Sequence, residues 1–125
     1  VSKATQDKII VTGAVSREEL AALYFRATAF CYPSLLEGFG LPVLEAMSYG
    51  TAVVTSKDRS TEEVAGVAAL TVDPLSVDEI AEALKLVLTD ASVAKELGDL
   101  GRERAKLFTW KAAAASTVDV YRSLL

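Results

Sequence analysis

Histidine is absent from this sequence of 125 residues, and cysteine occurs once, as Cys31. A structural zinc site draws most of its ligands from histidine and cysteine, so we expect no such metal centre. A disulfide needs two cysteines, which excludes a framework of disulfides within one chain. Cys31 lies in an apolar run, and we interpret it as a small buried side chain.

Long apolar runs and an excess of basic residues are also missing. No stretch of about 18 apolar residues is present, as a membrane-spanning helix would need, and the N-terminus lacks a signal-peptide pattern. The chain has 13 basic and 17 acidic residues and a net charge of −4. A nucleic-acid-binding surface needs clustered basic residues, so we expect no nucleic-acid partner. We expect a cytoplasmic protein that meets a membrane only through a larger parent protein.

Apolar residues make up 51% of the chain, enough to bury the core of one domain over residues 1–125. They include four short runs that are typical of strands buried on both faces, at residues 8–13, 29–32, 52–55 and 68–72. Helical patterns alternate with these runs, which favours a parallel sheet covered on both sides. We therefore predict an α/β fold: a Rossmann-like parallel sheet of about four strands with flanking helices.

Capping residues and apolar periodicity mark the predicted helices. Ser16 with Glu19, and Ser76 with Glu79, have the capping-box spacing, and Thr109 is the expected N-cap of the last helix. We expect the apolar side of that last helix to face the core, with Trp110, Ala114, Val118 or Thr117, Tyr121 and Leu125. The predicted helices span residues 16–27, 41–48, 62–64, 76–88, 91–107 and 109–125.

The stretch from Glu37 to Glu45 is the main candidate for a functional site. It follows the predicted strand at 29–32, and its glycines, Gly38 and Gly40, allow unusual dihedrals or a close approach to a ligand. A turn that leads into a helix can present backbone N–H groups to an anion. Helical side chains lean toward the helix N-terminus, so the Glu45 carboxylate can reach the start of its helix, where Glu37 arrives from the turn.

These groups favour a particular class of ligand. Ionised carboxylates accept hydrogen bonds from hydroxyls, and backbone N–H groups at a helix start bind phosphate. The combination fits a sugar nucleotide better than a sugar or a phosphate alone. Two other interpretations stay open on the residues themselves. Both carboxylates can be solvated, with Glu45 stabilising its helix N-terminus, and the glycines can serve the turn only.

The same stretch resembles a known family signature. Residues 33–50 read Pro-Ser-x-x-Glu-Gly-Phe-Gly-Leu-Pro-x-Leu-Glu-Ala-Met-x-x-Gly, which is similar to the E-x7-E signature of glycosyltransferase family 4, the retaining enzymes of GT-B fold. Phe108-Thr109-Trp110 resembles the closing motif of that family, and the resemblance extends over almost the whole chain. It implies the distal part of a GT-B C-terminal domain, which binds the donor.

The resemblance implies a role for each residue of the signature. Glu37, the implied catalytic residue, would contact hydroxyls of the donor sugar near the reacting carbon. Glu45 would accept hydrogen bonds from the ribose of the donor nucleotide. The donor sugar and diphosphate would be bound along the turn, chiefly through backbone amides, by Gly38, Phe39, Gly40 and Leu41.

The implied reaction moves a sugar from a nucleotide-diphosphate sugar to an acceptor hydroxyl with retention. The resemblance implies neither a metal ion nor another cofactor. A non-catalytic Rossmann-like binding or assembly module is the alternative, in which the fold is kept without the activity.

Parts of the family pattern have no counterpart in this sequence. They are the N-terminal acceptor domain, the first two strands of the donor domain, and the arginine and lysine that hold the diphosphate. Lys57 and Arg59 are interpreted as solvated instead. We therefore expect a fragment that is inactive by itself. The strand at 8–13 would pair beside residues 29–32, pair with a second copy, or be covered by another chain, and we expect self-association through the unpaired edges.

Overall fold

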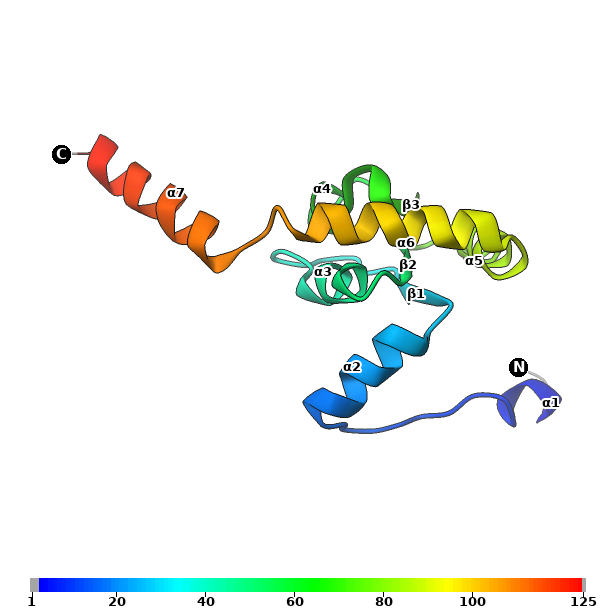
Figure 1. Ribbon diagram of the computed structural model, residues 1–125. Helices are drawn as coiled ribbons and strands as arrows, with labels where there is room; N and C mark the ends of the chain where they lie inside the picture. The colour runs from blue at the N-terminus through cyan, green and yellow to red at the C-terminus, as the bar shows by residue number, and fades with distance from the viewer. Residues whose placement is uncertain (1–2, 125) are drawn as a thin grey trace.

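A three-stranded parallel sheet lies at the centre of the molecule, in the order β1-β2-β3 (Figure 1). This computed structural model describes residues 3–124 of the chain. The predicted α/β fold with a parallel sheet and flanking helices is confirmed, with three strands instead of four. The strands are β1 (Ala29–Tyr32), β2 (Ala52–Ser56) and β3 (Ala69–Val72).

Helices precede, connect and follow the strands. Every predicted helix is present, and the single turn expected at 62–64 is a longer helix that begins at Ser60. The elements are α1 (Lys3–Gln6), α2 (Arg17–Arg26), α3 (Leu41–Ser48), α4 (Ser60–Ala65), the 3₁₀ turn η1 (Gly66–Ala68), α5 (Val77–Thr89), α6 (Ala91–Ala105) and α7 (Trp110–Ser123).

The capping residues explain where three of these helices begin. Ser16 and Glu19 form the predicted capping box of α2, each side chain accepting a hydrogen bond from the other's backbone amide. Ser76 caps α5, but the second predicted capping box is only half formed. The Glu79 carboxylate instead accepts a hydrogen bond from the Asp73 amide at 2.8 Å. It also forms an ion pair with Lys57, which ties α5 to the loop after β2. Thr109 is the N-cap of α7, as predicted.

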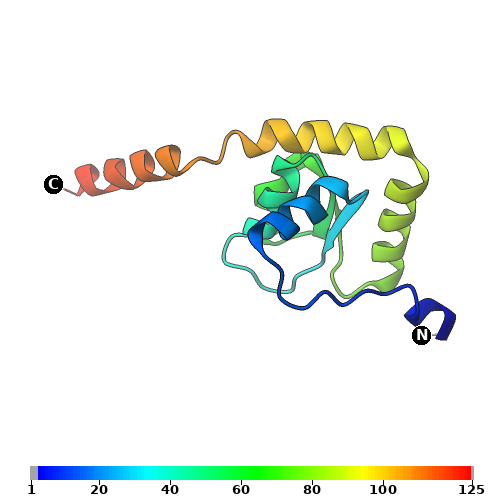
Figure 2. The ribbon, with the colours of Figure 1, turned by 60° about the horizontal axis from the view of Figure 1, so that its bottom comes forward.

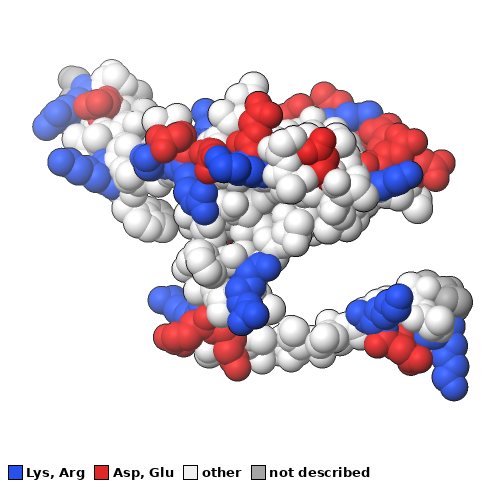
Figure 3. Space-filling view, turned by 45° about the vertical axis from the view of Figure 1, so that its right-hand side comes forward, with Lys and Arg blue, Asp and Glu red and all other residues white. Residues whose placement is uncertain are grey.

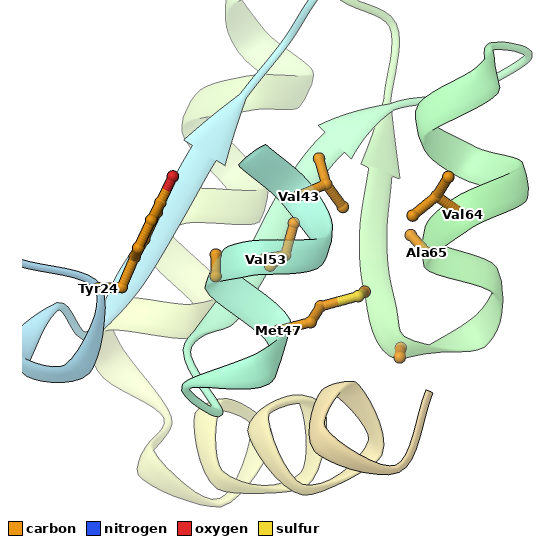
Figure 4. Packing of buried hydrophobic residues seen from close by; sticks show 8 residues of the cluster. Tyr24, Val43, Met47, Val53, Val64 and Ala65 are labelled. Atoms are coloured by element: carbon orange, nitrogen blue, oxygen red, sulfur yellow. The ribbon is translucent and has the colours of Figure 1, made fainter. Parts of the chain in front are cut away.

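β2 is buried along its whole length, and helices cover it on both faces. Side chains alternate along a strand, so Val53 packs on one face and Val54 on the other. The Val53 face is covered by α3 and α4, through residues that include Val43, Met47, Val64 and Ala65 (Figure 4). The Val54 face packs against residues of α5 and α6, among them Val87 and Leu97.

α6 approaches α3 closely, because two of its residues are glycines. A Cβ atom on Gly98 would lie 2.3 Å from the backbone oxygen of Gly50, just beyond α3. A Cβ atom on Gly101 would lie 3.2 Å from Cγ of Met47, which is completely buried. Arg102 adds a hydrogen bond to the Tyr49 carbonyl at 3.3 Å. These contacts fix α3, and with it the loop that leads into α3.

The strand predicted at residues 8–13 is wrong. The amides of Lys8 and Ile9 donate hydrogen bonds back to carbonyls at the end of α1, and the rest of the segment is an extended trace outside the sheet (Figure 2). Ile10 and Val11 are 85% and 90% exposed. β-Branched residues favour a strand only where they pack against cross-strand neighbours. Within the described residues the segment pairs neither beside β1 nor elsewhere, so its propensity is unused.

The packing predicted for the last helix is also wrong. α7 forms, but all of its residues are exposed, and the helix extends away from the domain (Figure 2). Trp110 is 85% exposed and Tyr121 is 65% exposed. The apolar stripe of α7 has no surface to cover among residues 3–124, and Leu125 lies outside the described residues. None of the helices described here is long and apolar enough to cross a membrane.

Candidate functional site

The turn between β1 and α3 depends on one glycine conformation. Gly40 is the N-cap of α3 and has φ 99° and ψ 43°, in the left-handed region that other residues avoid. A Cβ atom at this position would lie 2.9 Å from Cγ2 of the buried Thr61 in α4. The Gly40 carbonyl accepts hydrogen bonds from the amides of Val43 and Leu44, which starts the helix. Pro42 lies in the first turn, as predicted, where its missing N–H costs nothing.

Three consecutive backbone amides at this turn lack a hydrogen-bond acceptor among the described residues. The N–H groups of Phe39, Gly40 and Leu41 donate no hydrogen bond within the described part of the chain. Phe39 and Leu41 are 42% and 52% exposed, so the turn meets solvent at these two residues, while Gly40 between them is buried. Gly38 has open space where a side chain would be. The arrangement can bind an anion such as a phosphate.

Glu37 is held in place by hydroxyl groups. Its Oε1 accepts hydrogen bonds from the Tyr32 phenol at the end of β1 and from Ser34 Oγ at 3.3 Å. Its backbone oxygen accepts a hydrogen bond from Ser60 Oγ at 2.8 Å, at the start of α4. The hydrogen bond to Glu37 raises the pKa of Tyr32 above its usual value, because it is made by the neutral phenol.

Glu45 lies on the first turns of α3 with its side chain exposed. Its Oε2 accepts a hydrogen bond from the phenol of Tyr24, on α2, at 3.2 Å. Tyr24 is only 7% exposed. The pKa of Tyr24 is raised to about 12, chiefly by burial and further by the charge and hydrogen bond of Glu45. A phenol that stays protonated at neutral pH remains a hydrogen-bond donor to the carboxylate.

One aromatic cluster joins the supports of the two glutamates. The rings of Tyr24 and Phe30 meet edge to face at 5.3 Å, and those of Phe30 and Tyr32 stack at 5.7 Å. All three residues pack with α3 on the Val53 face of the sheet. Both carboxylates are therefore held from the same side of the sheet. The turn with its free amides lies between them in the chain.

Neither tyrosine could be recognised as part of the site from the sequence pattern. Tyr24 falls in the helix expected at residues 16–27 and Tyr32 in the strand expected at 29–32, with no role in the site predicted for either. The available signal was the phenol hydroxyl. A tyrosine hydroxyl that packs into the core needs a hydrogen-bond partner, and the two glutamates are possible acceptors. The choice of partner depends on how α2, β1 and α3 pack, which residue spacing does not give.

A small cavity of about 150 Å³ lies beside the turn. On its far side, Arg104 of α6 donates hydrogen bonds to the carbonyls of Glu63 and Val64 at 2.7 and 2.9 Å, where α4 ends. Its guanidinium also lies 5.1 Å from the ring centre of Phe108, which meets the Phe39 ring edge to face at 5.8 Å. The contacts of Arg104 and Phe108 brace the turn against α6.

Charges elsewhere are mixed. On the face shown in Figure 3, basic and acidic side chains lie close together. Several are paired along α6, such as Lys95 with Asp99. Lys57, expected to be solvated, pairs with Glu79, and Arg59 is exposed. In the part of the chain that the structure describes, no three His, Cys, Asp or Glu side chains form a cluster that could hold a metal ion.

Comparison with known proteins agrees with this architecture. Residues 2–104 match the family model described as Glycosyl transferases group 1. The chain is 42% identical over 123 residues to an MMP alpha-(1->4)-mannosyltransferase of Mycolicibacterium hassiacum, a match that covers 95% of this chain and 30% of that protein. It is 43% identical over 112 residues to the O-antigen chain mannosyltransferase B of Escherichia coli, with 90% and 29% covered.

A solved structure gives the same result. The chain superposes on sucrose-phosphate synthase from Thermosynechococcus elongatus with a TM-score of 0.83 and 35% sequence identity, covering 94% of this chain and 30% of that one. The chain therefore belongs to the group 1 glycosyl transferases, and its α/β fold matches a domain of a GT-B glycosyltransferase. It spans less than a third of the length of these relatives.

The turn geometry predicts a sharp difference between two neighbouring glycines. We expect Gly40→Ala to destabilise the chain by at least about 1–2 kcal/mol, since alanine is strained in the left-handed region and its Cβ would meet Thr61. Gly38→Ala is the matched control and should change stability by less than about 0.5 kcal/mol. Urea unfolding followed by circular dichroism measures both. Equal effects of the two substitutions would show that the turn does not need this conformation.

Proposed function

We propose that this chain is the donor-binding half of a retaining glycosyltransferase, and that its ligand is a nucleotide-diphosphate sugar. The observation that carries the proposal is the arrangement around α3. Two carboxylates are held from one side of the sheet, and three free amides lie along the turn between them. Membership of the group 1 family supports a sugar-transfer reaction for the parent protein.

Each part of the ligand has a group suited to it. Glu37 accepts hydrogen bonds from donor-sugar hydroxyls near the reacting carbon, and is the residue proposed to act in catalysis. The turn from Gly38 to Leu41 binds the sugar and diphosphate through its amides, because N–H groups at a helix start favour negative charge. Glu45 accepts hydrogen bonds from the ribose. All of these groups keep one side of the donor in a fixed position.

We propose that the parent reaction proceeds on one face of the donor, with retention. The diphosphate leaves as the acceptor hydroxyl enters, and Glu37 orients the sugar instead of forming a covalent bond with it. The relatives include proteins named for mannosyl transfer and for sucrose-phosphate synthesis, so their names span several sugars and acceptors. We propose that the acceptor is bound by a separate N-terminal domain, and that this chain alone binds the donor without transferring its sugar.

Isothermal titration of the chain with UDP, GDP and ADP tests the proposal. We expect heat of binding with at least one of the three, and its loss in Glu45→Ala, which removes the acceptor for the ribose hydroxyls. Glu82→Ala, an exposed glutamate on α5, is the control and should leave the affinity unchanged. Absence of heat with every nucleotide would contradict the proposal. It would favour an assembly module, whose partner binding should survive both Glu37→Ala and Glu45→Ala.

We also propose that the isolated chain associates with itself. β1 is at an edge of the sheet, and the apolar residues Ile10 and Val11 lie beside no other strand among the described residues. Exposed edges and apolar segments of this kind promote pairing between copies. We expect sedimentation velocity to show a dimer fraction that rises with protein concentration. Ile10→Lys should lower this fraction at every concentration. A chain that stays monomeric at every concentration would contradict this expectation.

A further inference from the structure

Among residues 3–124, each of the two glutamates accepts side-chain hydrogen bonds through only one carboxylate oxygen. Glu37 Oε1 accepts from both Tyr32 and Ser34, and Glu45 Oε2 accepts from Tyr24. In the described chain, no hydrogen bond is made to the second oxygen of either carboxylate. A carboxylate held by one oxygen has a fixed orientation, and its other oxygen remains an acceptor for a ligand hydroxyl.

The tyrosines that hold them are themselves anchored in β2. Thr51 Oγ1, immediately before β2, donates a hydrogen bond to the Tyr24 carbonyl at 2.5 Å. Thr55 Oγ1 donates to the Tyr32 carbonyl at 3.0 Å. Both threonines are buried, at 3% and 0% exposure. Each support therefore runs from the central strand through a tyrosine to a carboxylate.

The aromatic cluster limits the motion of the two phenols. Tyr24 contacts Phe30 at 5.3 Å and Tyr49 at 6.0 Å, and Tyr32 stacks on Phe30 at 5.7 Å. Tyr49 belongs to the cluster, but none of the described residues hydrogen-bonds its hydroxyl. The same cluster thus contains two tyrosines whose hydroxyls bond a glutamate and one whose hydroxyl does not.

We propose that Tyr24 and Tyr32 are positioning residues of the donor site, Tyr24 orienting Glu45 toward the ribose and Tyr32 orienting Glu37 toward the sugar. The inference rests on the proposed function, and it assigns support of nucleotide binding to one tyrosine and support of sugar binding to the other. Loss of the Tyr24 hydroxyl lowers the affinity for every ligand that contains the nucleotide. Loss of the Tyr32 hydroxyl lowers the affinity only for ligands that contain the sugar.

Titration with nucleoside diphosphates and the matching nucleotide sugars separates these effects. The probes are UDP with UDP-glucose, and GDP with GDP-mannose. Tyr24→Phe should raise the dissociation constant about fivefold or more for both members of the pair that binds, as expected for a weakened charged hydrogen bond. Tyr32→Phe should raise it to a similar extent for the nucleotide sugar and leave the nucleoside diphosphate unchanged. Tyr49→Phe should leave both constants unchanged.

The outcomes distinguish this inference from the proposed function. If Glu45→Ala abolishes binding but Tyr24→Phe and Tyr32→Phe bind with the affinity of the unsubstituted chain, the positioning role is overturned and the donor site stands. Equal weakening of both ligands by all three phenylalanine variants, Tyr49→Phe included, would also overturn it, because packing would then be the cause. If no nucleotide binds the unsubstituted chain, both proposals fail. Each variant keeps its aromatic ring, and an amide NMR spectrum checks that it folds. If Tyr24→Phe does not fold, the positioning role is judged from how Tyr32→Phe binds the nucleoside diphosphate and the nucleotide sugar.

Discussion

The pairing and burial of β2 is the constraint on which the rest of the structure depends. The strand pairs with β1 on one side and β3 on the other, and helices cover both of its faces. Thr51, immediately before the strand, and Thr55 within it cannot remain buried without hydrogen bonds, since an unpaired buried hydroxyl costs about 1–3 kcal/mol. They meet this need by bonding carbonyls of neighbouring elements. The core strand thereby fixes the backbone of both tyrosines that hold the candidate site.

The candidate site combines a rigid base with an open turn. Gly40 allows the chain to reverse tightly enough for α3 to begin against α4, and this leaves consecutive amides without acceptors. The glycines of α6 let that helix press against α3 from the other end. Binding groups placed by packed elements lose little entropy when a ligand arrives. The polar groups of the candidate site lie beside the packed core, while α7 and residues 8–13 extend away from it.

Much of this architecture could be predicted from the sequence. The three strands were short apolar runs bounded by polar or glycine-bearing segments, and Ser16 and Thr109 marked helix starts correctly. Residues 8–13 and the inner face of α7 were misassigned for one physical reason: their patterns describe surfaces that need a partner, and the described chain supplies none. For the candidate site, the sequence pattern singled out Glu37, Glu45 and the glycine turn, whose roles stay a proposal. It did not identify Tyr24 or Tyr32, because their hydroxyls find the glutamates only through tertiary packing.

In the function proposed above, the turn at the start of α3 and the two tyrosine-held carboxylates form one surface for a phosphorylated sugar compound. The most direct measurement is a map of ¹⁵N–¹H chemical-shift changes across the chain as GDP or UDP is added. The account predicts the largest changes at the amides of Phe39, Gly40 and Leu41, with smaller ones near Glu45. Saturable changes centred elsewhere, for example on α7 or on the outer face of α5, would contradict it.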